Sequence, residues 1–187
     1  MAPPGGRLIL SPSAEPILRL LRDGDPAMLR HALTAAAHAG RDGAAEPMVL
    51  AALLHDIGHA LDLDDGSEDD RDVEHAAYGA GWLSLWLPPA VTEPVRLHVE
   101  AKRYVCARDP AAIGRLTSRS RASLALQGGP MAEADARAFE RLPEFGAALA
   151  VRGWDDAPDL AAGDLAPLHA YRPMLERWMA VPRLRRA

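Results

Sequence analysis

The stretch that decides the fold runs from Val49 to His59 and reads VLAALLHDIGH. Glu46-Pro47 stands just before it, and proline is favoured in the first turn of a helix. Residues 48–55 are apolar almost all round a helix, which predicts a central, buried helix. A carboxylate at the end of such a helix needs a cation or several hydrogen bonds to offset its desolvation. The adjacent pair His55-Asp56 is therefore a candidate metal-binding site.

Helical patterns recur on both sides of this stretch, whereas β-branched runs and hairpin turns are nearly absent. The sequence therefore predicts an all-α protein. A chain of 187 residues fits one domain, so we expect a single domain over residues 1–187, with its core in about 26–160. The expected helices cover residues 17–22, 26–38, 48–55, 73–87, 94–105, 111–126 (as one helix or two), 133–141, 144–152 and 173–181.

Composition excludes several classes of protein. A net charge of −5 argues against a nucleic-acid binder, because phosphate-backbone binding needs a basic surface. The longest apolar segment, Pro47–Leu54, is too short to span a membrane, and no signal peptide is recognisable. With Cys106 as the single cysteine, neither an intramolecular disulfide nor a thiolate-rich zinc site is possible. We expect a cytoplasmic protein, either a monomer or a small homo-oligomer.

Three further histidines lie among apolar residues on three other predicted helices. They are His31 in LRHAL, His75 in VEHAA and His98 in VRLHV. Any one of them alone is more simply interpreted as a hydrogen-bonded core histidine. Together with His55-Asp56 they are better explained by one dinuclear metal centre. Asp56 is suited to bridge two ions, because a carboxylate has two oxygens whereas each imidazole offers one free nitrogen.

The chain resembles the HD-domain superfamily, and within it the mixed-valent di-iron oxygenases. The resemblance is to the hydroxyphosphonate-cleaving enzymes and, more distantly, to myo-inositol oxygenase. It extends from about Leu29 to Leu160, and HVEAKRYV and LQGGPM favour this branch over the ordinary HD phosphohydrolases. The matching segments are LRHAL, LLHDIGH, EHAAYGAGWL, HVEAKRYV, SLALQGGPM and VRGWDDAPDL.

The resemblance implies two iron ions in the Fe(II)/Fe(III) state, with O₂ as co-substrate. One iron would be held by His31, His55 and Asp155, with Asp156 as the alternative to Asp155. The other iron would be held by His75 and His98, and Asp56 would bridge the two ions. Imidazole and carboxylate ligands also suit manganese or zinc, so the ligand types alone do not choose the metal.

Lys102 is the only lysine beside twenty arginines. It follows His98 by four residues, which places both side chains on one face of a helix. A lysine is ordinarily interpreted as a solvated surface charge. Because this chain uses arginine at every other basic position, a lysine at this one position favours a functional role. The resemblance implies that Lys102 and His59 are catalytic and contact the substrate phosphonate. It also implies that Ser123 and Arg152 contact this anion.

Three functions compete. The first is an oxygenase that cleaves the carbon–phosphorus bond of a small 1-hydroxyphosphonate; the second is a phosphohydrolase acting on a nucleotide or another phosphomonoester. The third, a non-catalytic binding module, is disfavoured because all six ligands are present.

The related aminophosphonate enzymes have a Tyr and a Glu before the first histidine, but Leu20–Asp25 has no Tyr, and only Asp23 or Asp25 could replace the Glu. This favours a different hydroxyphosphonate or another small hydroxylated anion. The acidic segment 61–72 is either a surface loop or a lid.

Overall fold

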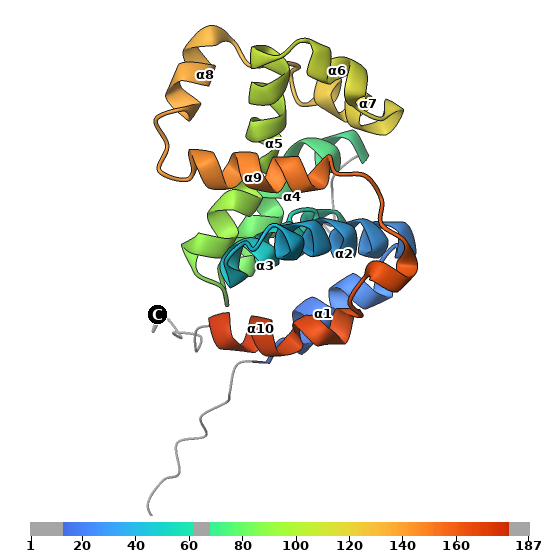
Figure 1. The fold of residues 1–187 in the computed structure, drawn as a ribbon. Helices are drawn as coiled ribbons and strands as arrows, with labels where there is room; N and C mark the ends of the chain where they lie inside the picture. The colour runs from blue at the N-terminus through green and yellow to red at the C-terminus, as the bar shows by residue number, and fades with distance from the viewer. Residues whose placement is uncertain (1–12, 62–67, 180–187) are drawn as a thin grey trace, which may run out of the picture.

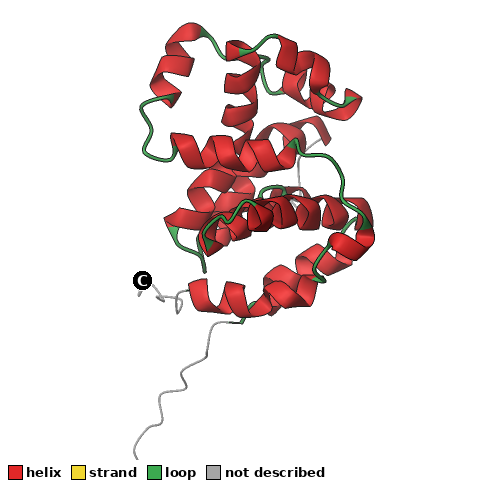
Figure 2. Cartoon of the chain, viewed as in Figure 1, coloured by secondary structure: helices red, strands yellow, loops and turns green. Residues whose placement is uncertain are grey.

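The computed structural model describes residues 13–61 and 68–179, and within these ranges every regular element is a helix (Figures 1 and 2). The prediction of an all-α protein is therefore confirmed. The α-helices are α1 (Glu15–Asp23), α2 (Pro26–Arg41), α3 (Glu46–Leu54), α4 (Glu68–Leu83), α5 (Pro89–Arg108), α6 (Ala111–Arg115), α7 (Ser118–Leu126), α8 (Glu133–Phe139), α9 (Phe145–Asp155) and α10 (Arg172–Trp178). Three short 3₁₀ helices, η1 (Ile57–Ala60), η2 (Ala162–Asp164) and η3 (Leu168–Tyr171), complete the set.

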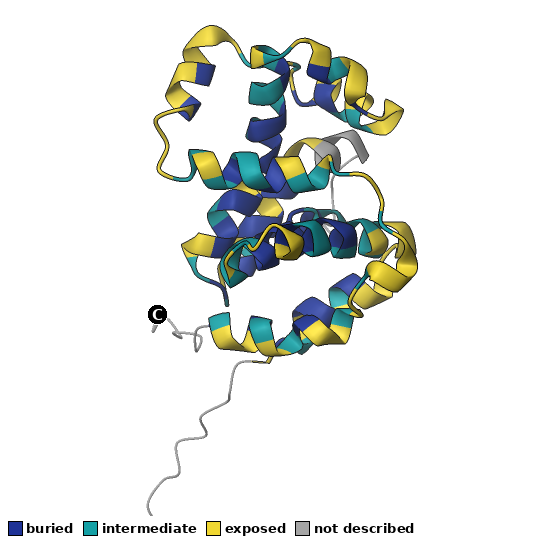
Figure 3. Ribbon diagram, viewed as in Figure 1, coloured by how far each residue is buried: buried dark blue, intermediate teal, exposed yellow. Residues whose placement is uncertain are grey.

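Helix α3 lies at the centre of the fold, as its sequence predicts. All six residues from Val49 to Leu54 are buried, and α2, α5 and α9 pack around the helix (Figure 3). Burial on all sides explains why α3 has no polar face. Helix α10 closes the core from below with Leu175, next to Ile17 and Leu18 of α1 (Figure 1). The last two residues of the helix predicted for 173–181 lie outside the described residues.

Helix α5 begins earlier than the sequence indicates. It starts at Pro89 rather than Pro94, so the start predicted for this helix is wrong. Pro94 is the sixth residue of α5, so it removes one backbone hydrogen bond within the first two turns, and the helix continues through it. The result is a long helix that runs from the end of the molecule with α6, α7 and α8 to the central helices (Figure 1).

Helix α4 also starts earlier than predicted, at Glu68 instead of Val73. The acidic end of segment 61–72 is therefore helical, which agrees with the preference for acidic residues in the first turn of a helix. Residues 62–67, on which the choice between lid and surface loop depends, lie outside the described residues. No helix in the described parts of the chain is both long and apolar enough to cross a membrane.

Candidate metal centre

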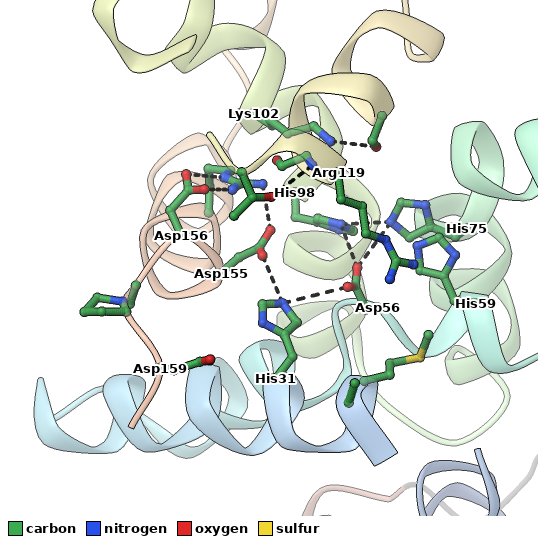
Figure 4. Close-up of a pocket in the computed structure, with 18 of the residues that line it drawn as sticks. His31, Asp56, His59, His75, His98, Lys102, Arg119, Asp155, Asp156 and Asp159 are labelled. Atoms are coloured by element: carbon green, nitrogen blue, oxygen red, sulfur yellow. Dashed lines mark hydrogen bonds and ion pairs between the residues drawn. The ribbon is translucent and has the colours of Figure 1, made fainter. Parts of the chain in front are cut away.

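Six side chains from five parts of the fold meet in the middle of the molecule. Figure 4 labels all of them except His55. They form two groups of three, and in each group the possible ligand atoms lie within 4.8 Å of one another. The first group is His31 on α2, His55 directly after α3 and Asp155 at the end of α9; the second is Asp56, His75 on α4 and His98 on α5. The structure thus brings together all six residues that the sequence singled out.

The first group is compact. The Nε2 atom of His31 lies 3.2 Å from Nε2 of His55 and 3.0 Å from Oδ1 of Asp155. Nε2 of His55 lies 3.5 Å from the same Asp155 oxygen. Three donor atoms therefore face one point.

Asp56 is a member of the second group and also faces the histidines of the first. Its Oδ1 lies 3.4 Å from Nε2 of His75 and 3.4 Å from Nε2 of His98. Its Oδ2 lies 3.5 Å from Nε2 of His55 and 3.8 Å from Nε2 of His31. Because each oxygen faces a different pair of imidazoles, this carboxylate has the geometry of a bridge between two ions.

The spacing of the nitrogens fits metal coordination. An ion bound to imidazole nitrogens at about 2.1 Å places two ligands at right angles about 3.0 Å apart. The observed Nε2–Nε2 distances are 3.2 Å for His31 and His55, and 3.1 Å for His75 and His98. The donor set of four imidazoles and two carboxylates suits iron, manganese or zinc.

The backbone orients two of the imidazoles. Nδ1 of His55 lies 2.8 Å from the carbonyl oxygen of Ala52, and Nδ1 of His98 lies 2.7 Å from that of Val95. A carbonyl can only accept, so in both rings Nδ1–H donates, and this turns Nε2 toward the centre. Such outer hydrogen bonds are the usual way in which a protein fixes a metal-binding histidine.

The electrostatics of the centre call for a cation. Burial acts to raise the pKa of Asp56, but the charge of His55 and the hydrogen bonds from the histidines hold it well below its ordinary value. Burial acts to lower the pKa of His55, but Asp56 and Asp155 outweigh it and raise that pKa well above the usual range. Burial lowers the pKa of His98 to about 4, so this ring is neutral at neutral pH. A metal ion can supply the positive charge that the buried carboxylates otherwise draw from a proton.

Arg152 separates the roles of Asp155 and Asp156. Its buried guanidinium donates from Nη1 to Oδ2 of Asp155 at 2.7 Å, which leaves Oδ1 turned toward His31 and His55. It also donates from Nε to Asp156 at 2.6 Å, and from Nη2 to the other oxygen of that carboxylate. Asp155 therefore faces the histidines, whereas Asp156 is held by Arg152.

A cavity of about 470 Å³ opens over the centre. All four predicted substrate contacts, His59, Lys102, Ser123 and Arg152, line it. Lys102 is buried and donates to the Ser123 hydroxyl at 3.0 Å, so one charged and one neutral polar group lie together on the wall. The His59 ring stacks on that of His75, with centroids 3.9 Å apart.

Gly58 has a role different from the one the sequence indicated. A glycine directly after a buried helix and His-Asp indicates a helix end that turns His59 back, but α3 ends at Leu54 and Gly58 lies inside η1 without a positive φ. A Cβ on Gly58 would lie 1.9 Å from the carbonyl oxygen of His75. Glycine is needed here because η1 and α4 touch at the backbone, and this contact sets Asp56 beside His75.

The segment LQGGPM does not line the cavity. Gly128 and Gly129 have φ angles of +92° and +70°, so the segment is a tight turn. Arg103 of α5 donates to the carbonyl of Gly129 at 2.9 Å and fastens this turn to the helix. The turn therefore supports α7 from outside.

Sequence reasoning missed Arg115 and Arg119, which also line the cavity. Both occur in a chain with twenty arginines, and no local pattern distinguishes them. Only the position of α7 over the centre reveals Arg119 as a cavity residue (Figure 4).

Comparisons with known proteins identify the family of the chain. The chain is 39% identical over 157 residues to the 1-hydroxy-2-(trimethylamino)ethyl phosphonate dioxygenase (glycine-betaine-forming) of Leisingera caerulea, a match covering 82% of this chain and 80% of the relative. It is 37% identical over 158 residues to the hydroxymethylphosphonate dioxygenase of Gimesia maris, covering 82% and 78%. The family model of the HD domain matches residues 27–120, which include the four histidines of the centre and Asp56. The chain belongs to the HD-domain family.

Proposed function

We propose that this protein is an O₂-dependent oxygenase that cleaves the carbon–phosphorus bond of a small 1-hydroxyphosphonate. The observation that carries the proposal is one carboxylate, Asp56, whose two oxygens face two different pairs of imidazoles beneath a cation-lined cavity. The names of the two relatives support the same chemistry. One substrate and one O₂ would yield one carboxylate and one phosphate, with both atoms of O₂ accounted for in the products.

His31, His55 and Asp155 would hold one iron, and His75 and His98 the other, with Asp56 as the bridge. When bound as an Fe(II)/Fe(III) pair, the metals would supply the redox chemistry with O₂. The protein positions the pair: the carbonyls of Ala52 and Val95 fix two rings, and Arg152 turns Asp155 toward the centre. These supports keep the donor atoms preorganised, so that little ordering is needed when metal binds.

The substrate is a small dianion, which explains cationic groups beside the centre of an acidic protein. Lys102 would bind a phosphonate oxygen through a charge-assisted hydrogen bond, and Ser123 would hold the ammonium group in place. His59 would donate a further hydrogen bond from its position on the His75 ring. Arg152 would act on the substrate chiefly through charge, since much of its guanidinium is bound to Asp155 and Asp156.

The test is a stoichiometric assay. Protein loaded with Fe(II) is given 1-hydroxyalkylphosphonates under air, and the O₂ consumed, phosphate released and carboxylate formed are measured. The proposal predicts equal amounts of all three, and no phosphate when O₂ is removed. Release of phosphate from phosphomonoesters without O₂, with no cleavage of hydroxyphosphonates, would instead establish the phosphohydrolase.

A further inference from the structure

Arg119 lines the cavity, and the proposed chemistry gives it no role. Among the described residues of the lining, four side chains are lysine or arginine: Lys102, Arg115, Arg119 and Arg152. Arg152 is paired with two carboxylates, and Nη2 of Arg115 donates to Asp109 at 2.5 Å. Lys102 is bound to Ser123. Arg119 has neither an ion pair nor a hydrogen bond with any residue in the described part of the chain.

The position of Arg119 makes its charge available to a bound molecule. It lies on α7 one turn before Ser123, so both residues share the helix face that covers the centre. Figure 4 shows its side chain extending from α7 into the cavity, toward the side of Asp56 and His59. One helical turn is about 5.4 Å, so a phosphonate held at Lys102 and Ser123 leaves Arg119 opposite another part of the same small substrate.

We propose that Arg119 is a specificity-determining residue that binds a second acidic group, a carboxylate, at the far end of the substrate. The inference rests on the proposed function and narrows it to carboxylated 1-hydroxyphosphonates. A guanidinium binds a carboxylate through two parallel hydrogen bonds, and it repels a cation at the same place. The trimethylamino group in the name of the Leisingera caerulea relative's substrate is such a cation.

Asp159 is the alternative to Arg119 as the residue that faces the far end of the substrate, and its negative charge would favour a cationic group there. It lines the cavity from the loop after α9, where His38 binds the carbonyl of Pro158 and Arg30 that of Leu160. This loop lies against α2, and Figure 4 shows Asp159 well apart from Lys102. Arg119, by contrast, starts on α7 one turn from Ser123 and extends away from Lys102, toward the side of Asp56 and His59 (Figure 4). A substrate whose phosphonate is held at Lys102 and Ser123 therefore has its far end within reach of this arginine.

The test compares three 1-hydroxyphosphonates of equal chain length that end in a methyl, a carboxylate or a trimethylammonium group. For the wild type, kcat/KM should be about tenfold higher for the carboxylate than for the methyl compound, the value of one hydrogen bond to a charged group. In Arg119→Ala this ratio should fall to about 1. Arg121→Ala removes the same charge from α7 outside the cavity, and should leave the ratio at its wild-type value.

Three results would overturn the inference. The first is equal use of the methyl and carboxylate compounds by the wild type. The second is a preference for the trimethylammonium compound that Asp159→Asn abolishes. The third is an equal loss for all three compounds in Arg119→Ala, which would place the arginine on the phosphonate. If no compound is cleaved, the proposed function fails; titration calorimetry with the same compounds then decides whether Arg119 confers tighter binding of the carboxylate.

Discussion

Replacing Gly58 with alanine places a methyl group 1.9 Å from the carbonyl oxygen of His75. Real Cβ contacts essentially never fall below 3.0 Å and are ordinary only from 3.4 Å. The backbones of η1 and α4 must therefore separate by about 1.1–1.5 Å, because the atom in the way belongs to the main chain and cannot rotate aside. The separation moves His75 away from Asp56, whose Oδ1 lies 3.4 Å from its Nε2.

Two losses should follow from this displacement. Overpacking of this kind costs about 1–3 kcal/mol in the free energy of unfolding. The site that includes His75 should lose affinity for metal by about 10- to 100-fold or more, because a ligand displaced by 1 Å or more is worse than the loss of an outer hydrogen bond. The other site, formed by His31, His55 and Asp155, should keep its ion, so iron should fall from about two to about one per chain.

The assay combines urea unfolding of the apoprotein with iron analysis after anaerobic loading and gel filtration. Gly81→Ala is the matched control, since Gly81 lies on the exposed face of α4 and a Cβ there meets nothing within 4 Å. The control should keep two irons and gain up to about 1 kcal/mol from its higher helix propensity. A Gly58→Ala protein with wild-type stability and two tightly bound irons would refute the argument.

Three further predictions concern the centre and its cavity. Asp155→Ala should reduce the iron content to about one per chain, whereas Asp156→Ala should keep two, as measured by metal analysis of both variants. Lys102→Ala should raise the KM for a hydroxyphosphonate by about 10- to 100-fold, the value of a hydrogen bond to a charged group, and steady-state kinetics that show no change would contradict this. Burial lowers the pKa of His98 to about 4, whereas in the unfolded chain it is about 6.5. Between these values the unfolded chain binds the extra proton, so stability falls as the pH is lowered through this window. From pH 7 to pH 5 the apoprotein should therefore lose about 2 kcal/mol more of its unfolding free energy than His98→Gln does; equal losses in urea titrations would argue against a buried, neutral His98.

The sequence predicts the helical fold and the members of the centre for the same reason. Apolar residues repeat at helical spacing, and a histidine or aspartate on such an apolar face needs a partner inside the protein. His31, His75 and His98 stand out in this way, each on a different helix, and the structure brings them to Asp56. That they hold iron stays a prediction.

The features that the sequence does not reveal depend on how the helices are placed in space. Gly58 is required because the backbone of α4 passes beside it, and Arg119 is a cavity residue because α7 lies over the centre. Neither contact leaves a local pattern. The start of α5 was mispredicted for a different reason. Proline usually marks the beginning of a helix, but Pro94 lies inside α5, where it costs a single backbone hydrogen bond.

The measurement that tests the central claim most directly is low-temperature EPR on protein loaded anaerobically with Fe(II) and then partly oxidised, together with an iron count. The two donor groups that share Asp56 predict an antiferromagnetically coupled Fe(II)/Fe(III) signal from about two irons per chain, and loss of that coupling in Asp56→Ala. A single iron per chain, or two irons that never show coupling, would contradict a carboxylate-bridged dinuclear centre.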